Sequence, residues 1–330
     1  MNSQPAMVTS VSPAQSPALP LRNNGKWFSS PVGIYAGSVE ETRKRVPSFE
    51  RRPFASSTAA NSHMDMIVRL ALEAPEVPVG VVSKSYVLIQ HEAVFDSIVA
   101  VLDAAGIPPA ELKVSLTLTE YGERMELRVL FPDFFQFDPG DGNPTGLQLR
   151  CSNSVDGSSR LFLLLGWLRF VCGNGLILGT TRLNVRMIHN RQISIPRLAD
   201  SLLHALGAVN REKNIIRGWA ERPVTEDALI GFVDGPLRKR WGTWAAARAY
   251  LICTKGIDGE PRDPFGQAPP HLREMLPGKT VPGALVPART VYAVSQALSW
   301  LAKERSDVSE EYERTRDIPT LIRVLLDHRN

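Results

Sequence analysis

The clearest hydrophobic pattern in the chain is a pair of alternating segments, residues 112–118 and 125–131. In both, every second residue is apolar, which is the period of a half-buried β-strand. Pairing Leu118 with Met125 brings both apolar sets onto one face and leaves Tyr121-Gly122 as a two-residue loop. The pattern therefore predicts an antiparallel hairpin that covers a core on one side.

A second hairpin is predicted for residues 147–171. Asp156-Gly157 is a strong turn signal, because glycine tolerates a positive φ and an aspartate side chain bonds to its own turn backbone. A two-residue turn at this point aligns Cys151 with Phe162 across the strands.

Helical spacing of apolar residues dominates the second half of the chain. An apolar stripe begins at Leu198 and recurs every three to four residues, and a shorter stripe near the first hairpin ends at Gly106. The predicted helices span residues 94–105, 198–219 (one helix or two), 224–255 with a break near 235–236, 288–304, and 310–328 interrupted at Pro319. Short strands are predicted at 87–89, 176–178 and 185–188, and a Gly/Pro-rich loop at 255–287.

These elements predict an α+β fold in which a mostly antiparallel sheet with a packed helix precedes a helical C-terminal region. Residues 1–60 are rich in Pro, Ser and Ala without apolar periodicity, so we expect a disordered tail. Residues 61–192 form the predicted sheet region, and residues 193–330 the helical region, packed on the sheet as one domain. Within the tail, the basic residues of 43–45 and 51–52 suggest either a solvated segment or a contact arm for an acidic partner.

Composition narrows the class of protein further. The 330 residues are 43% hydrophobic and 22% charged, which is ordinary for a globular protein with its own core. The 3 cysteines are widely spaced without a CxxC pair, so neither a disulfide framework nor a metal site is predicted, and no cofactor is expected. Without a compact signal core or an apolar run of about 20 residues, we expect a cytoplasmic protein with no membrane partner.

Three segments then carry a family resemblance: CSNSVDGSS (151–159), LRFVCGNGL (168–176) and RMIHN (186–190). They resemble the phage/plasmid-like protein family built on domain of unknown function 932, and the resemblance extends over about 81–326. It implies a home on mobile genetic elements such as phages and plasmids, but no known activity. Family members often carry His where this chain has Val155, so any chemistry of that His is absent here.

Cys172 and His189 are the candidate catalytic pair. A thiol and an imidazole are the minimum for nucleophilic cysteine catalysis, with Asn174 or Asp156 as a possible orienting group. The alternative is that Cys172 is a small apolar strand residue and His189 a structural histidine. The two turns also suggest a polar binding site at one sheet edge, made of Asn153, Asp156, Gly157 and Asn174.

The uneven distribution of charge is the better functional clue. The net charge is only +4, but residues 182–222 hold eight Lys or Arg against three acids, and residues 236–255 hold five and no acid. The second stretch interleaves tryptophans with cations, which is typical of proteins that bind phosphates and stack on bases. The candidate nucleic-acid-binding residues are Arg182, Arg186, Arg191, Arg238, Lys239, Arg240, Trp241, Trp244 and Arg248. The alternative is a solvated basic helix whose aromatic residues lie in the core.

The sequence therefore predicts a nucleic-acid-binding protein of a mobile element, with single-stranded DNA as the favoured partner and an accessory role in recombination or replication. The alternatives are a cysteine-dependent enzyme that uses Cys172 and His189, or a protein-interaction adaptor. A homo-oligomer or a phage or plasmid protein is a possible further partner.

Overall fold

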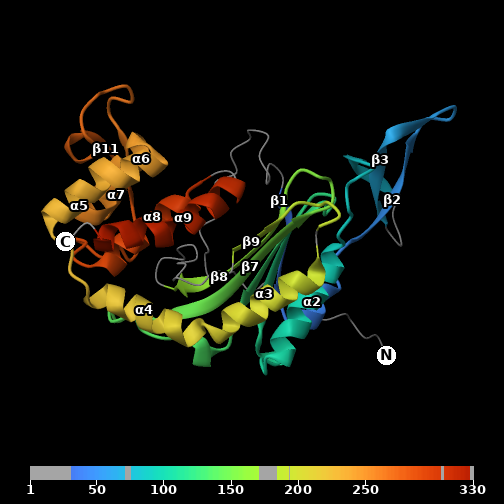
Figure 1. The fold of residues 1–330 in the computed structure, drawn as a ribbon, viewed down its shortest axis with the longest axis horizontal. Coiled ribbons are helices and arrows are strands. Elements are labelled where there is room, and N and C mark those ends of the chain that lie inside the picture. Colours follow the sequence, from blue (N-terminus) through green and yellow to red (C-terminus); the bar gives the residue numbers. More distant parts are fainter. Residues whose placement is uncertain (1–30, 71–75, 171–183, 193, 306–307, 328–330) are drawn as a thin grey trace, which may run out of the picture.

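A six-stranded antiparallel sheet forms the centre of the molecule (Figure 1). The structure, a computed structural model, describes residues 31–70, 76–170, 184–192, 194–305 and 308–327. The order of the central strands is β1-β5-β6-β7-β8-β9. Their bounds are β1 Pro31–Gly37, β5 Lys113–Thr119, β6 Arg124–Leu130, β7 Thr145–Ser154, β8 Leu161–Arg169 and β9 Asn184–Met187.

Two smaller antiparallel sheets lie on either side of the central one in Figure 1. One contains β2 Ser48–Ala55, β3 Ala60–Leu70 and β4 Val77–Ser83, and its hairpin projects from the body. The other pairs β10 Ile257–Pro261 with β11 Met275–Thr280 at the opposite end of the molecule.

Helices cover both faces of the central sheet (Figure 1). The longer ones are α2 His91–Ala104, α3 Ile195–Gly207, α4 Val209–Glu221, α7 Thr243–Lys255, α8 Val291–Lys303 and α9 Val308–Asp327. The shorter ones are α1 Val39–Arg43, α5 Glu226–Phe232, a π-helical turn η3 Val233–Leu237, α6 Arg238–Trp241, and the 3-10 turns η1 Pro109–Glu111, η2 Asp133–Phe135 and η4 Pro270–Leu272. The predicted α+β class and helical C-terminal region are confirmed.

The first hairpin has the register that its alternation predicts. Leu118 lies opposite Met125, and Leu116 opposite Leu127. Gly122 has a φ of 73°, as a tight turn requires, although the strands end one residue earlier than predicted and leave a four-residue loop. These apolar side chains lie in one core cluster with those of α2, α3 and the C-terminal helices.

The second hairpin forms, but the predicted register is wrong by one residue. Cys151 lies opposite Leu163, and Phe162 lies opposite Ser152. The turn contains one more residue than predicted, because Asp156 also accepts hydrogen bonds from the backbone and hydroxyl of Ser158. A one-residue shift moves every side chain to the other face. Phe162 therefore leaves the main core and stacks on Tyr312 of α9.

The predicted tail is too long. Residues 31–55 form β1, α1 and β2, whereas residues 1–30 lie outside the described residues. The pairing partner of β1 is β5, with Tyr35 opposite Leu116. A strand whose partner lies some 80 positions away in the sequence leaves little local signal, which is why composition alone suggested disorder.

Three further predictions are corrected. Residues 87–89 form no strand, and the Val87 N–H donates to the carbonyl of His189. The loop predicted at 255–287 contains β10 and β11, whose close approach needs glycine, since a Cβ on Gly278 would clash with the Asp258 carbonyl oxygen. Helix α9 continues through Pro319, because its neighbours Ile318 and Ile322 are fully buried, and core packing outweighs the cost of proline.

A buried ion network joins α9 to the second face of the sheet. Arg150 on β7 contacts Glu126 on β6 at 3.2 Å and also pairs with Glu311 on α9, and the side chains of all three are at most 6% exposed. Arg128 pairs with Glu126 as well. Burial alone would raise the pKa of Glu126, but the charges of Arg128 and Arg150 outweigh burial and lower the pKa to about 2.

We expect the substitution Glu311→Gln to lower the free energy of unfolding by about 3 kcal/mol, because it leaves the buried Arg150 charge only partly compensated. Urea denaturation followed by circular dichroism measures this change. The matched control is Glu313→Gln on the same helix, whose pair with Arg186 is exposed and contributes less than about 1 kcal/mol. Equal effects of the two substitutions would contradict this account of α9.

Candidate functional site

The motif segment 151–159 forms the end of β7 and the turn into β8. Its Asn153 is fully buried, and its side-chain N–H donates to the Ile89 carbonyl at 3.0 Å and to His91 Nδ1 at 2.9 Å. Because His91 Nδ1 accepts, these contacts assign the ring hydrogen to Nε2, which donates to the Gly122 carbonyl at 2.9 Å. Asn153 and His91 thus connect three separate segments of the chain.

His189 belongs to the same region. It is 5% exposed, its ring stacks on Tyr86 with centroids 5.0 Å apart, and its Nδ1 donates to the Val87 carbonyl at 3.2 Å. The Tyr86 hydroxyl in turn donates to the Ser154 carbonyl at 3.0 Å. The segment 86–89 is therefore held between the motif turn and His189 by its backbone and by the Tyr86 side chain.

Asp156 and Gly157 complete the turn. One Asp156 oxygen accepts from Ser158, and the other accepts from Arg124 Nε at 3.2 Å. Gly157 has a φ of 77°. Gly80 of β4 packs so closely against Asp156 that a Cβ there would come within 2.7 Å of its Cα. The turn thus supports the smaller sheet. Of the predicted polar turn site, Asn153 points into the protein and Asn174 lies outside the described residues.

The predicted basic residues separate into compensated and uncompensated ones. Arg240 pairs with Asp317 of α9, and Arg248 pairs with Asp258 through two contacts of 2.7 Å. Trp241 is 8% exposed and donates its indole N–H to Asp317. These contacts hold α6 against α9 and α7 against β10. The side chains of Arg240, Trp241 and Arg248 therefore stabilise the packing of these helices.

Arg238 and Lys239 are different. Both are exposed, and neither makes an ion pair with any residue that the structure describes. Arg186 pairs with Glu313, Arg191 is exposed, and Arg182 lies outside the described residues. In the second basic stretch, the cations without an ion pair to a described residue are therefore Arg238 and Lys239 on α6 and Lys255 at the end of α7.

Two exposed aromatic rings lie at the same end of the molecule. Trp244 at the start of α7 is 48% exposed, and its indole N–H donates to the Pro264 carbonyl at 3.1 Å. The next residue, Phe265, is 90% exposed. Arg273 holds this loop in place by donating to the carbonyls of Ala268 and Asp263 at 3.1 and 3.2 Å.

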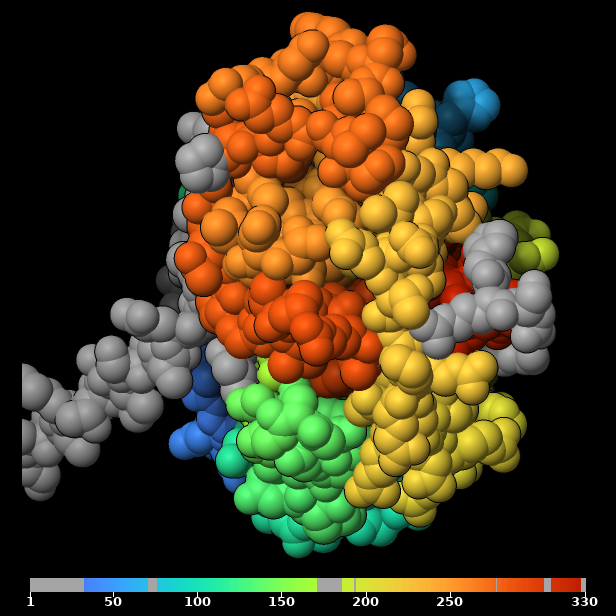
Figure 2. All heavy atoms as spheres, turned by 90° about the vertical axis from the view of Figure 1, so that its left-hand side faces the viewer, coloured from blue at the N-terminus to red at the C-terminus, as the bar shows by residue number. Residues whose placement is uncertain are grey.

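Phe265 was missed by the sequence prediction. Its signal was a phenylalanine in the polar Gly/Pro-rich segment DPFG, where no core position is expected. Figure 2 shows the end of the molecule to which β10–β11 (orange) and α5–α6 (yellow) contribute. We call Arg238, Lys239, Trp244 and Phe265 the aromatic–basic surface.

Comparison with known proteins gives one family. The model of the domain of unknown function (DUF932) matches residues 78–251, just over half of the chain. The chain belongs to the DUF932 family. No curated protein and no solved structure shows significant similarity to it. The DUF932 match runs from β4 through most of α7, so it includes the motif turn, Arg238, Lys239 and Trp244 but ends before Phe265.

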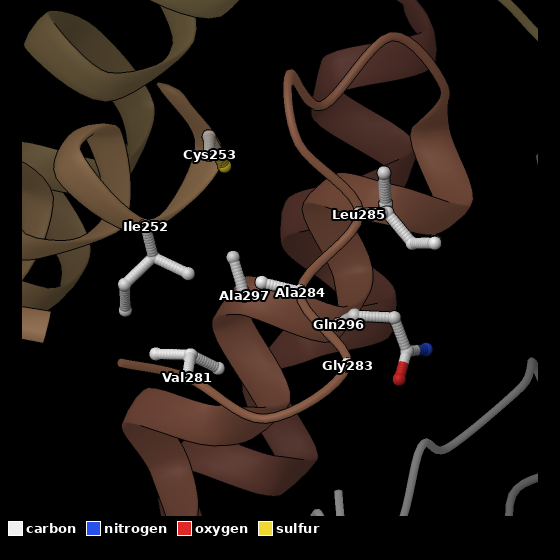
Figure 3. A pocket seen from close by; sticks show the side chains of 9 residues that line it. Ile252, Cys253, Val281, Gly283, Ala284, Leu285, Gln296 and Ala297 are labelled. Atoms are coloured by element: carbon white, nitrogen blue, oxygen red, sulfur yellow. The ribbon is translucent and has the colours of Figure 1, made fainter. Parts of the chain in front are cut away.

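The cysteines of this DUF932 protein give little support to thiol chemistry within the described residues. Cys172 lies outside them, so its pairing with His189 stays a prediction. Cys151 and Cys253 are buried free thiols, and burial raises the pKa of Cys253 to about 12 and the pKa of Cys151 further. Cys253 lines a small apolar hollow of about 10 Å³ between α7 and α8 (Figure 3), which is room for about one water molecule.

No helix in the described part of the chain is long and apolar enough to cross a bilayer.

We expect Cys151 and Cys253 to remain unmodified by iodoacetamide at pH 7.5 in the native protein, because the thiolate is the reactive species and burial suppresses it. Peptide mass spectrometry measures the labelling of each cysteine. The Cys172→Ser variant is the control, since rapid labelling that disappears in it would identify an accessible Cys172 and support the cysteine-enzyme hypothesis. Rapid native labelling of Cys151 or Cys253 would contradict the burial described above.

The buried histidine also predicts a pH dependence. Burial lowers the pKa of His91 to about 4 from 6.5, so the unfolded chain binds a proton before the folded one as the pH falls. The stabilisation is complete above pH 6.5 and decreases down to about pH 4, by on the order of 3 kcal/mol. Urea denaturation of the wild type and His91→Gln across this range measures the difference.

The His91→Gln variant should lose this part of the pH dependence. The exposed His63 on β3 provides the control, and His63→Gln should follow the wild type. If His91→Gln and the wild type lose stability in parallel between pH 6.5 and 5, His91 is not the buried neutral group that its contacts indicate.

Proposed function

We propose that this DUF932 protein binds single-stranded nucleic acid, DNA in particular, through the aromatic–basic surface. The observation that carries the proposal is the pair of exposed rings, Trp244 and Phe265, together with Arg238 and Lys239 of the adjacent helix α6, which make no ion pair with any described residue. Single strands expose the faces of their bases, and stacking on an aromatic ring contributes about 1–3 kcal/mol per base. Arg and Lys side chains supply the contacts with phosphates.

The Trp244 ring and the loop backbone that carries Phe265 are held in place before any ligand arrives. The Trp244 indole is fixed by its hydrogen bond to Pro264, and the Phe265 loop is fixed by Arg273. A ring that is already ordered loses less conformational entropy when a base stacks on it. A surface that binds any base face has little sequence preference, which favours an accessory protein over a sequence-specific regulator.

We assign this activity to the cytoplasm, in recombination or replication of a mobile element such as a phage or plasmid. The resemblance of the motif segments to phage/plasmid-like proteins supports this part of the proposal. The family itself has no assigned function, so the binding surface rather than the family name supports the biochemical activity.

We expect Phe265→Ala to weaken binding of a labelled 20-nucleotide oligothymidine at least about fivefold, because one stacking platform is lost. We expect the double substitution Arg238→Gln and Lys239→Gln to reduce the slope of log K against log salt by about 1.4, since each phosphate contact on a single strand contributes about 0.7. Fluorescence anisotropy from about 50 to 300 mM salt measures both quantities.

The controls use residues away from this surface. Phe134 on η2 is 63% exposed, so Phe134→Ala removes another exposed ring, and Lys113→Gln removes an exposed charge at one end of β5. Both should bind like the wild type. The proposal fails if the wild type has no affinity near physiological salt, or if the double substitution leaves both affinity and slope unchanged.

A further inference from the structure

A polar hollow of about 80 Å³ lies between residues of β1, β3 and β5, where the projecting sheet meets the central one. In Figure 1 these strands lie at the opposite end of the molecule from α6 and β11. Its wall includes Gly33 and Tyr35 of β1, Arg69 of β3 and Thr119 at the end of β5. Arg45, which follows α1, also lines the hollow, and its guanidinium carbon lies 5.4 Å from the centre of the Tyr35 ring. Four separate segments of the chain therefore meet around one space.

Arg45 and Arg69 differ from the other arginines of this region. Arg43 pairs with Glu92 and Asp96, Arg51 pairs with Asp65, and Arg52 pairs with Glu50 and Glu76. Within the residues that the structure describes, neither Arg45 nor Arg69 has such a carboxylate partner.

Arg69 is the more unusual of the two. Its Nε is buried and has no hydrogen-bond acceptor among the described residues. A guanidinium N–H that is removed from water without an acceptor costs free energy, so a buried one next to an open hollow is the chemistry of an anion site.

Tyr35 adds a neutral donor to this arrangement. Its hydroxyl lies against Gly33, where a Cβ would come within 2.7 Å of the phenol oxygen, so only glycine at position 33 leaves room for the ring. The Tyr35 hydroxyl donates no hydrogen bond within the described residues. The charged and phenolic groups that line the hollow are therefore two guanidinium groups, the Tyr35 phenol and the Glu120 carboxylate.

We propose that this hollow binds a phosphate group, through Arg45 and Arg69 with the Tyr35 hydroxyl as a further donor. A volume of about 80 Å³ exceeds the space of one water molecule and suits a tetrahedral oxyanion better than a drug-sized ligand. Guanidinium groups match phosphate geometry through paired N–H donors. Glu120 also lines the hollow and is exposed, and its carboxylate disfavours additional negative charge there, which favours a monophosphate over a polyphosphate.

The proposal is independent of nucleic-acid binding at the aromatic–basic surface, because none of its residues belongs to that surface. The same phosphate chemistry occurs in free inorganic phosphate and in a nucleoside monophosphate. Isothermal titration calorimetry of the full chain in phosphate-free buffer, with inorganic phosphate, thymidine 5′-monophosphate and thymidine as titrants, distinguishes these sources.

We expect saturable binding of one equivalent of phosphate or of thymidine 5′-monophosphate, and none of thymidine. The exposed Arg45 gives the decisive variant, since Arg45→Gln should weaken binding at least about tenfold without affecting folding, and Arg45→Lys should recover part of the loss. Arg69→Gln should weaken binding further. Lys113→Gln, which removes one charge at the far end of β5, is the matched control and should bind like the wild type.

The site is supported if inorganic phosphate or thymidine 5′-monophosphate binds and the affinity falls in Arg45→Gln. The compound that binds more tightly then identifies which source of the phosphate group the site prefers. No saturable heat with either compound, or equal affinity in Arg45→Gln and the wild type, overturns it.

Discussion

The position of α9 depends on Arg150, a fully charged side chain in the middle of the central sheet. The sheet supplies one of its partners, Glu126, and α9 supplies the other, Glu311. Neither acid alone balances the charges, because Glu126 is shared with Arg128. The polar face of the sheet is therefore stable only with α9 in place, and the stacking of Phe162 on Tyr312 fills the space beside this network.

The same helix also positions residues at the other end of the molecule. Further along α9, Asp317 accepts from both Arg240 and Trp241 of α6. This leaves Arg238 and Lys239 as the exposed cations of α6 that pair with no described acid, shortly before the chain reaches Trp244. The proposed binding surface is thus a consequence of how α9 packs. The family motif has a comparable role at the opposite end, where Asn153, His91 and His189 hold the segment that enters α2.

Sequence patterns correctly predicted the features that depend on interactions between residues close in the sequence. Alternation alone was enough for the register of the first hairpin, and helical spacing predicted α2 and its end at Gly106. The second hairpin was predicted one residue out of register, because the size of its turn depends on hydrogen bonds between Asp156 and Ser158. Strand β1 was missed because its partner β5 is distant in the sequence. Tertiary pairing is not visible in composition.

In the candidate site, too, the sequence predicted the local pattern but not the features that depend on tertiary contacts. The basic, aromatic-bearing stretch was evident from the sequence, but its side chains could not be sorted into buried and exposed ones. Trp241 and Trp244 are three residues apart, and the first packs in the core and donates to Asp317, whereas the second is exposed. Phe265 was overlooked because loop residues carry no periodic signal, and its proximity to Trp244 arises from the hydrogen bond to Pro264.

Photochemical crosslinking tests the central claim most directly. The full chain, bound to an oligothymidine that contains 4-thiothymidine, would be irradiated and digested, and the crosslinked peptides identified by mass spectrometry. Our account predicts crosslinks at Trp244 and Phe265, with neighbouring peptides from α6 protected from trypsin at Arg238 and Lys239. Crosslinks confined to other parts of the chain, with none at Trp244 or Phe265, would contradict it.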